Sequence, residues 1–249
     1  MVWGMSLPSG FGDYWPDGRF ESDPQQPLQD GWGGRLKQYY FAQTPEDQKV
    51  LYDHRGDVSL ATHSYPYFVS LKFSREKGSS VDAETPPISA IKPHEPPQYF
   101  HTLKNYKNLA SLIHTESRIV AVDEALKSII ERLEPETHQF FPIEIRMRRE
   151  KVYPIQYYIL VVRQHFDSFS PGESRDDSYR KDGVDFYFHE ETKKAMSGLA
   201  FNRTIFDGAH LWRERRLSRE WLTCFSDELI AEIDRADLRL PRHYKMKEV

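Results

Sequence analysis

The arrangement of apolar and polar positions is nearly the same in two segments of the chain. In the first, residues 119–122 form a short apolar run, and Asp123 follows. The apolar side chains after Asp123 recur at helical spacing, at Leu126, Ile129, Ile130 and Leu133. Positions i, i+3, i+4 and i+7 lie on one face of a helix, and an Asp just before them is typical of an N-cap. This segment therefore predicts a short strand that leads into an amphipathic helix.

The second segment shows the same order of features. Residues 222–225 are largely apolar, and Ser226 then precedes a polar turn containing Asp227 and Glu228. Negative charge in a first helical turn interacts favourably with the helix dipole. The apolar stripe of this helix consists of Leu229, Ile230 and Ile233. We therefore predict a second strand that enters a capped helix.

Between these two segments the chain favours strands. Residues 139–147 alternate loosely between apolar and polar, and residues 184–189, VDFYFH, are a further strand candidate. Residues 156–163 form a continuous apolar run of the kind found in central, buried strands. Because strand candidates outnumber helices here, we predict an α+β fold, with a mostly antiparallel sheet and a few helices packed on one face.

The first hundred residues are aromatic and rich in proline. Residues 36–41 and 65–73 combine aromatic with apolar or β-branched side chains and are predicted as strands. The prolines of residues 76–97 predict a long extended connection. We expect residues 1–100 to form an N-terminal extension or subdomain with aromatic-rich strands and this Pro-rich connection. Residues 101–249 are then expected to form the main α+β domain.

Charge and cysteine content narrow the class of protein. The formal net charge is −4, so the balance gives no reason to expect direct nucleic-acid binding. The single cysteine, Cys224, permits no disulfide within the chain, which suits a reducing compartment. We find no signal peptide and no apolar run long enough to span a membrane. The expected location is the cytoplasm.

Residues with catalytic potential are present, but none forms a complete motif. The ten histidines show no pair at the spacing of a helical zinc site, so no metal is expected. His101-Thr102 matches half of a phosphodiesterase motif, and the second half is missing. Cys224 is interpreted as a small buried side chain, with a reactive thiol as the alternative. The glycine-rich turn at residues 31–34 lacks the Lys-Ser/Thr of a phosphate loop.

Charged residues gather at three places. One basic group contains Arg146, Arg148, Arg149 and Lys151, and a second contains Arg213, Arg215, Arg216 and Arg219. Neighbouring glutamates favour a salt-bridged surface over a nucleic-acid site for both groups. The polar, loop-forming residues 167–183 begin an acidic stretch that extends to residue 191. This stretch is a solvated loop, a cation site or a surface for a basic partner.

The residues from about 118 to 240 resemble the Imm11 immunity-protein family of bacterial polymorphic toxin systems. The resemblance is carried, in order, by IVAVDEALKSIIERLEP, HQFFPIEI, YYILVV, GAHLWRERR and CFSDELIAEIDRADL. These motifs are typical of a fold rather than of a catalytic site, and they cover roughly half of the chain. The resemblance identifies residues 101–249 as an immunity-like domain.

The resemblance implies a non-enzymatic, cytosolic protein without a cofactor, which binds and neutralises a cognate toxin encoded nearby. Because many such toxins are basic, an acidic surface would speed their encounter with the inhibitor. The candidate partner-binding residues are Asp176, Asp177, Asp182, Asp185, Glu190 and Glu191. Two alternatives remain: a scaffold or adaptor of a toxin-delivery cluster, and a hydrolase whose scattered histidines and carboxylates meet only in the folded protein.

Overall fold

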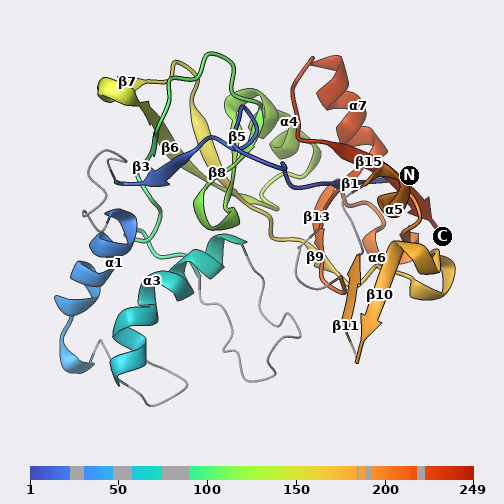
Figure 1. Cartoon of the computed structure of the whole chain (residues 1–249), viewed down its shortest axis with the longest axis horizontal. Coiled ribbons are helices and arrows are strands. Elements are labelled where there is room, and N and C mark those ends of the chain that lie inside the picture. Colours follow the sequence, from blue (N-terminus) through green and yellow to red (C-terminus); the bar gives the residue numbers. More distant parts are fainter. Residues whose placement is uncertain (23–30, 47–57, 75–89, 184, 189–191, 218–221) are drawn as a thin grey trace.

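The computed structural model describes residues 1–22, 31–46, 58–74, 90–183, 185–188, 192–217 and 222–249. Within these residues the strands form a seven-stranded sheet, a six-stranded sheet and a two-stranded ribbon. Figure 1 shows the two larger sheets next to each other, with α4 (Glu124–Leu133) and α7 (Asp227–Arg235) together at one end of the molecule. No described helix is long and apolar enough to cross a membrane.

The seven-stranded sheet has the spatial order β2-β3-β6-β8-β5-β4, and β7 pairs with β6. Its strands are β2 (Gly18–Phe20), β3 (Tyr99–Thr102), β4 (Leu112–His114), β5 (Val120–Asp123), β6 (Gln139–Met147), β7 (Lys151–Val152) and β8 (Tyr157–Val161). All of its pairs are antiparallel except β3 with β6. The strands predicted at residues 119–122, 139–147 and 156–163 are therefore confirmed as β5, β6 and β8.

The six-stranded sheet has the order β12-β15-β1-β14-β13-β9. It therefore pairs the first strand of the chain, β1, with the last, β15. Its strands are β1 (Val2–Met5), β9 (His165–Phe166), β12 (Ala200–Phe201), β13 (Leu211–Glu214), β14 (Thr223–Ser226) and β15 (His243–Glu248). The pairs β12–β15 and β9–β13 are parallel, and the others are antiparallel. The ribbon consists of β10 (Tyr179–Asp182) and β11 (Asp185–Phe188). The predicted strand at 184–189 is β11 in its described part.

The helices fall into groups on different parts of the sheets. Besides α4 and α7, the described residues form α1 (Gly31–Phe41), α3 (Val58–Ser74), α5 (Lys193–Met196) and α6 (Arg203–Phe206). Short 3-10 turns are η1 (Glu116–Arg118), η2 (Arg148–Glu150), η3 (Pro171–Glu173) and η4 (Asp176–Ser178). The protein is thus an α+β protein, as the sequence predicts, and its sheets are mixed but mostly antiparallel. Its helices lie on both faces of the seven-stranded sheet and not on one face, because both faces are apolar.

The two strand–cap–helix segments have the predicted structure, and they pack against each other. The Asp123 carboxylate accepts a hydrogen bond from the Leu126 N–H at 2.8 Å, and the Ser226 hydroxyl accepts one from the Leu229 N–H at 3.1 Å. Such caps satisfy backbone donors that a helix leaves unpaired at its start. The apolar stripes of α4 and α7 lie in one buried cluster with residues of both larger sheets. The similarity between the segments therefore marks the two units that join these sheets.

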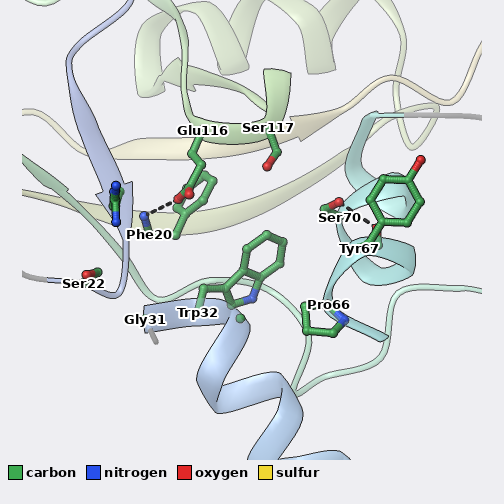
Figure 2. A pocket seen from close by; sticks show the side chains of 11 residues that line it. Phe20, Ser22, Gly31, Trp32, Pro66, Tyr67, Ser70, Glu116 and Ser117 are labelled. Atoms are coloured by element: carbon green, nitrogen blue, oxygen red, sulfur yellow. Dashed lines mark hydrogen bonds between the residues drawn. The ribbon is translucent and has the colours of Figure 1, made fainter. Parts of the chain in front are cut away.

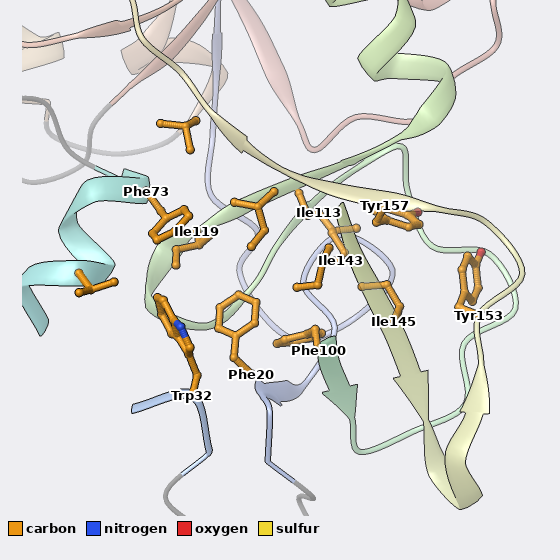
Figure 3. Close-up of a cluster of buried hydrophobic side chains, with 14 of the residues drawn as sticks. Phe20, Trp32, Phe73, Phe100, Ile113, Ile119, Ile143, Ile145, Tyr153 and Tyr157 are labelled. Carbon is orange, nitrogen blue, oxygen red and sulfur yellow. The ribbon is translucent and has the colours of Figure 1, made fainter. Parts of the chain in front are cut away.

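The seven-stranded sheet is buried on both faces. Along β5 and the residue before it, Ile119 and Ala121 belong to one apolar cluster, while Val120 and Val122 belong to the cluster with α4 and α7. Side chains alternate between the two faces of a strand, so a strand buried on both faces is continuously apolar. The first of these clusters contains Phe20, Trp32, Phe73 and Phe100 (Figure 3). Helices α1 and α3 cover this face.

Two predicted strands are wrong, because residues 36–41 and 65–73 belong to helices α1 and α3. Trp32, Leu36 and Tyr40 recur every four residues and are all buried, as are Tyr65, Val69 and Phe73. This spacing places each set on one helical face, against the sheet. The burial outweighs the poor helix propensity of the aromatic residues and the helix-breaking tendency of Pro66, which lies inside α3.

The described residues 1–22 supply a strand to each larger sheet. β1 lies between β14 and β15 in the six-stranded sheet, and β2 pairs with β3 in the seven-stranded sheet. The Pro-rich connection at 76–97 is described only from residue 90. The division of the chain near residue 100 stays a prediction.

Candidate functional site

The acidic residues predicted to face a partner lie around the two-stranded ribbon. Asp176 and Asp177 are in η4, and Asp182 pairs with Asp185 where β10 turns into β11. Asp182 and Asp185 thus lie at the tip of the ribbon, whereas Asp176 and Asp177 lie at its base, just before β10. Glu190 and Glu191 lie outside the described residues, so the structure places only part of the predicted set.

The surface around these carboxylates is mixed in charge. Asp177 forms ion pairs with Arg175 at 3.1 Å and Lys194 at 3.4 Å. β10 also carries Arg180 and Lys181, whose cations lie over aromatic rings of β11. Exposed pairs of this kind contribute little to stability. The ribbon therefore presents alternating charges rather than a purely acidic patch. Its described residues include no group of carboxylates and histidines that could hold a metal ion.

A pocket of about 250 Å³ lies where the start of α1 meets β2, α3 and η1 (Figure 2). The Trp32 indole stands in this pocket between Phe20 and Pro66, and it donates a hydrogen bond to the Glu95 carbonyl at 2.8 Å. Glu116 accepts a hydrogen bond from the Phe20 N–H at 2.9 Å. Polar groups line the rest, from Arg19, Ser22, Ser70 and Ser117. The pocket has room for about one side chain of a partner.

Helices α1 and α3 also carry exposed aromatic side chains, of which Tyr67 lines the pocket. Tyr67 and Phe68 are 55% and 43% exposed, and Tyr39 and Phe41 are 38% and 61% exposed. The buried Tyr40 and Tyr65 rings lie 5.4 Å apart, which places these parts of the helices side by side. We call Tyr39, Phe41, Tyr67 and Phe68 the helical aromatic surface. Aromatic residues are enriched at protein interfaces, so this surface is typical of a docking site.

The sequence prediction missed this surface because it assigned both segments to strands. In a strand, Tyr65, Tyr67, Val69 and Phe73 all lie on the same face. In a helix, residues spaced by four share one face, and Tyr67 and Phe68 turn away from it. The signal that identifies the helix is the fourfold spacing of the buried residues together with a neighbouring segment of the same spacing.

The three histidines most relevant to a hydrolase, His101, His114 and His138, lie in different surroundings in the described structure. His138 donates from Nε2 to Glu134 at 2.7 Å and accepts the Arg163 N–H at Nδ1. His101 lies 4.0 Å from the exposed Glu150. His114 is buried, and neither of its ring nitrogens has a hydrogen bond among the described residues. These three histidines, the ones most relevant to a hydrolase, therefore occupy three separate environments.

The remaining candidates from the sequence are largely structural. Cys224 is fully buried, and burial raises the pKa of its thiol well above the usual range, so it is not an activated nucleophile. The glycine-rich turn at 31–34 begins helix α1. Arg146 forms an ion pair with Glu144 and stacks on the Tyr99 ring, and Arg215 pairs with Asp167. Arg219 lies outside the described residues.

Acid is expected to destabilise the fold through His114. Burial, and then the nearby Arg213, lowers the pKa of His114 to about 4, so the folded protein holds this ring neutral. The unfolded chain, with a histidine pKa of about 6.5, binds a proton that the folded chain does not. Above about pH 6.5, His114 therefore costs the folded protein no stability. Between there and pH 4, its protonation in the unfolded chain lowers the free energy of unfolding by up to about 3 kcal/mol.

The measurement is the free energy of unfolding in urea, from pH 7 to pH 4, for the native protein and His114→Phe. The phenylalanine variant should lose less stability toward acid, while a His243→Gln control should follow the native protein. The comparison between variants is needed because burial raises the pKa of Glu214 to about 7, which acts in the opposite direction. Parallel curves for His114→Phe and the native protein would contradict the prediction.

Comparison with known families gives one finding. The model of the immunity protein family Imm11 matches residues 43–248, which include α3, both strand–cap–helix segments and the acidic ribbon. No curated protein matches the chain.

Proposed function

Because the chain belongs to the Imm11 immunity protein family, we propose that it binds and neutralises a cognate toxin of a bacterial polymorphic toxin system. The observation that carries this proposal is the family match, which extends over most of the chain. In this role the protein acts in the cytoplasm by binding, without a catalytic step of its own. The toxin is expected to be the product of a neighbouring gene.

We further propose that the helical aromatic surface supplies the affinity for the toxin. Tyr67 and Phe68 project from α3 beside a pocket that can accept an anchor side chain of the partner. A few aromatic anchors in or near pockets usually contribute most of the binding energy of an interface. The apolar faces beneath them are packed on the sheet, so the surface is rigid before binding.

The acidic residues of the ribbon are proposed to steer the toxin rather than to hold it. Asp182 and Asp185 are at the tip of the ribbon, and α1, α3 and the ribbon all project from the lower edge of the view in Figure 1. Charges at the rim of an interface chiefly change the association rate and its dependence on salt. Glu190 and Glu191 are included in this proposal from the sequence alone.

The test of the function is co-expression in bacteria with each neighbouring gene product, scored by growth and by co-purification. Rescue of growth together with a stable complex supports the immunity role. A complex with a delivery component, without protection, favours the scaffold alternative. Hydrolysis of a substrate by the purified protein favours the enzyme alternative, although no observation on its described residues specifically supports it.

The interface proposal predicts different effects for two pairs of substitutions. Tyr67→Ala with Phe68→Ala is expected to weaken toxin binding about a hundredfold, mainly through faster dissociation. Asp182→Asn with Asp185→Asn is expected to slow association severalfold at low salt and to leave dissociation unchanged. Surface plasmon resonance at two salt concentrations measures both rates.

The matched control removes exposed apolar area elsewhere. Val152 and Ile155 are 48% and 46% exposed beside β7, close to the values of the two aromatic residues. Val152→Ala with Ile155→Ala should bind the toxin as the native protein does. If this control loses binding while the α3 variant keeps it, the interface lies on the seven-stranded sheet and the helical aromatic surface is not the docking site.

A further inference from the structure

A buried arginine without an acidic partner lies at the end of the core between the two larger sheets. Arg213, in β13, is only 6% exposed. Among the described residues its guanidinium forms no ion pair and no hydrogen bond. An unpaired charge in a protein interior is costly, so buried arginines are normally paired. The described side chains thus supply no acceptor for this guanidinium, which keeps a small exposed fraction.

A second donor without a partner lies in the opposite sheet. His114 ends β4, is 5% exposed, and forms no hydrogen bond through either ring nitrogen within the described part of the chain. Leu112 and Leu211 belong to the same apolar cluster, and His114 and Arg213 each follow two residues later. Because alternate residues of a strand share a face, His114 and Arg213 both border this cluster.

The strand register adds two polar side chains on the same face as Arg213. Arg213 pairs with Thr223 in β14 and with His165 in β9, and both are held at this position by the sheet. The adjacent Glu214 lies on the opposite face, where its carboxylate accepts hydrogen bonds from Ser168, Phe169 and Arg216. Glu214, the carboxylate nearest to Arg213 in the sequence, therefore does not pair with the guanidinium.

We propose that Arg213 and His114 bind a small tetrahedral oxyanion, of the phosphate or sulfate type, between the two sheets. A guanidinium donates two parallel hydrogen bonds to such an ion, and an imidazole N–H and the Thr223 hydroxyl add further donors. The low exposure of Arg213 and His114 limits the occupant to a free ion or the terminal phosphoryl group of a larger molecule. This site is independent of the proposed toxin interface.

The electrostatics agree with this assignment. Burial, with Arg213 the next largest cause, lowers the pKa of both His114 and His165 to about 4, and burial lowers the pKa of Arg213 to about 10. Desolvation is the main cause of all three shifts, and nearby cations add to it: Arg213 and Arg118 at His114, and Arg213, Arg215 and Arg163 at His165. A bound dianion would favour the charged form of each group. Binding is therefore expected to strengthen as the pH falls from 7 toward 6, where phosphate remains negatively charged.

The test uses the full chain and inorganic phosphate as the probe. Phosphate is titrated against the native protein by calorimetry and by thermal unfolding, at an ionic strength held constant with chloride. We expect saturable binding and a rise in Tm. Arg213→Met, which removes the donor but keeps much of the side-chain volume, is expected to weaken binding about tenfold to a hundredfold.

The matched control is Arg215→Met, which removes a cation that pairs with Asp167 at the surface. It should bind phosphate as the native protein does. His114→Phe provides a second test if methionine at position 213 prevents folding. Binding of phenyl phosphate as well as phosphate identifies a phosphoryl group on a larger molecule as the occupant, and binding of phosphate alone identifies the free ion. Equal effects of chloride and phosphate, or full binding by Arg213→Met, would overturn the proposal.

Discussion

Replacing Glu134 with alanine is expected to lower the free energy of unfolding by about 3–5 kcal/mol, because it leaves several buried donors without an acceptor. Glu134 is the C-cap residue of helix α4. Its carboxylate accepts hydrogen bonds from His138 at 2.7 Å and from the Gln164 amide at 2.6 Å. It also accepts the backbone N–H groups of His210 at 2.6 Å and Leu211 at 3.1 Å. One side chain thus connects α4 to the strand β13 of the other sheet.

Glu134→Gln should be almost as harmful, although it changes one atom. The amide places an NH2 group where a carboxylate oxygen now meets N–H donors. Burial by itself raises the pKa of Glu134, but the hydrogen bonds from His138 and His210 outweigh it and hold the pKa below its usual range. The carboxylate form is therefore the one that the site stabilises. Urea unfolding at pH 7 measures both variants.

The control for Glu134 is Glu131, an exposed residue of the same helix that pairs with Lys127 at 2.7 Å. Glu131→Ala is expected to cost less than about 1 kcal/mol, as for other exposed ion pairs. If Glu134→Ala unfolds at the same urea concentration as Glu131→Ala, the buried network does not contribute to joining the two sheets.

Replacing Glu95 with leucine is expected to cost about 3–5 kcal/mol, because it leaves the Lys72 ammonium buried and unpaired. Lys72 and Glu95 lie 2.6 Å apart, with 8% and 0% of their side chains exposed. Burial lowers the pKa of Lys72, and Glu95 opposes that effect. Glu95 also accepts the Lys92 N–H at 2.7 Å. The pair ties α3, with its exposed aromatic residues, to the segment before β3.

The double variant Lys72→Met with Glu95→Leu is expected to recover most of the lost stability, because apolar side chains of similar volume can replace a buried ion pair. Thermal and urea unfolding of the two single variants and the double variant give the coupling between the residues. Arg132 and Glu232, an exposed pair that joins α4 to α7, serve as the comparison. Equal stability of Glu95→Leu and the native protein would show that Lys72 reaches water without Glu95.

The secondary structure was predictable where a local signal was complete. α4 and α7 each combine an N-cap with an apolar stripe. β6 follows a loose apolar–polar alternation, and β8 follows a run of apolar residues. α1 and α3 were not recognised, because their aromatic content favours strands and Pro66 disfavours a helix. Only the sheet beneath them makes the helical spacing of their buried residues favourable.

The candidate sites were less accessible to sequence reasoning than the fold. The acidic residues 176–185 could be named from composition, but the ion pair between Asp177 and Lys194 depends on how η4 and α5 pack in the folded protein. The helical aromatic surface requires α1 and α3 to lie side by side. Arg213 and His114 are 99 positions apart and belong to different sheets. No spacing along the chain indicates that they share a core.

The sequence by itself determined the α+β class, the two strand–cap–helix units and the resemblance to the immunity-protein family. The strand–cap–helix units depend on interactions within about fifteen residues, such as caps, helical stripes and strand alternation, and the resemblance depends on the order of such segments along the chain. The tertiary structure alone decided which segments become helices against the sheet, which aromatic residues remain exposed, and which charged groups are buried without partners. These properties depend on contacts between residues far apart in the chain, because burial and charge pairing are properties of the packed molecule.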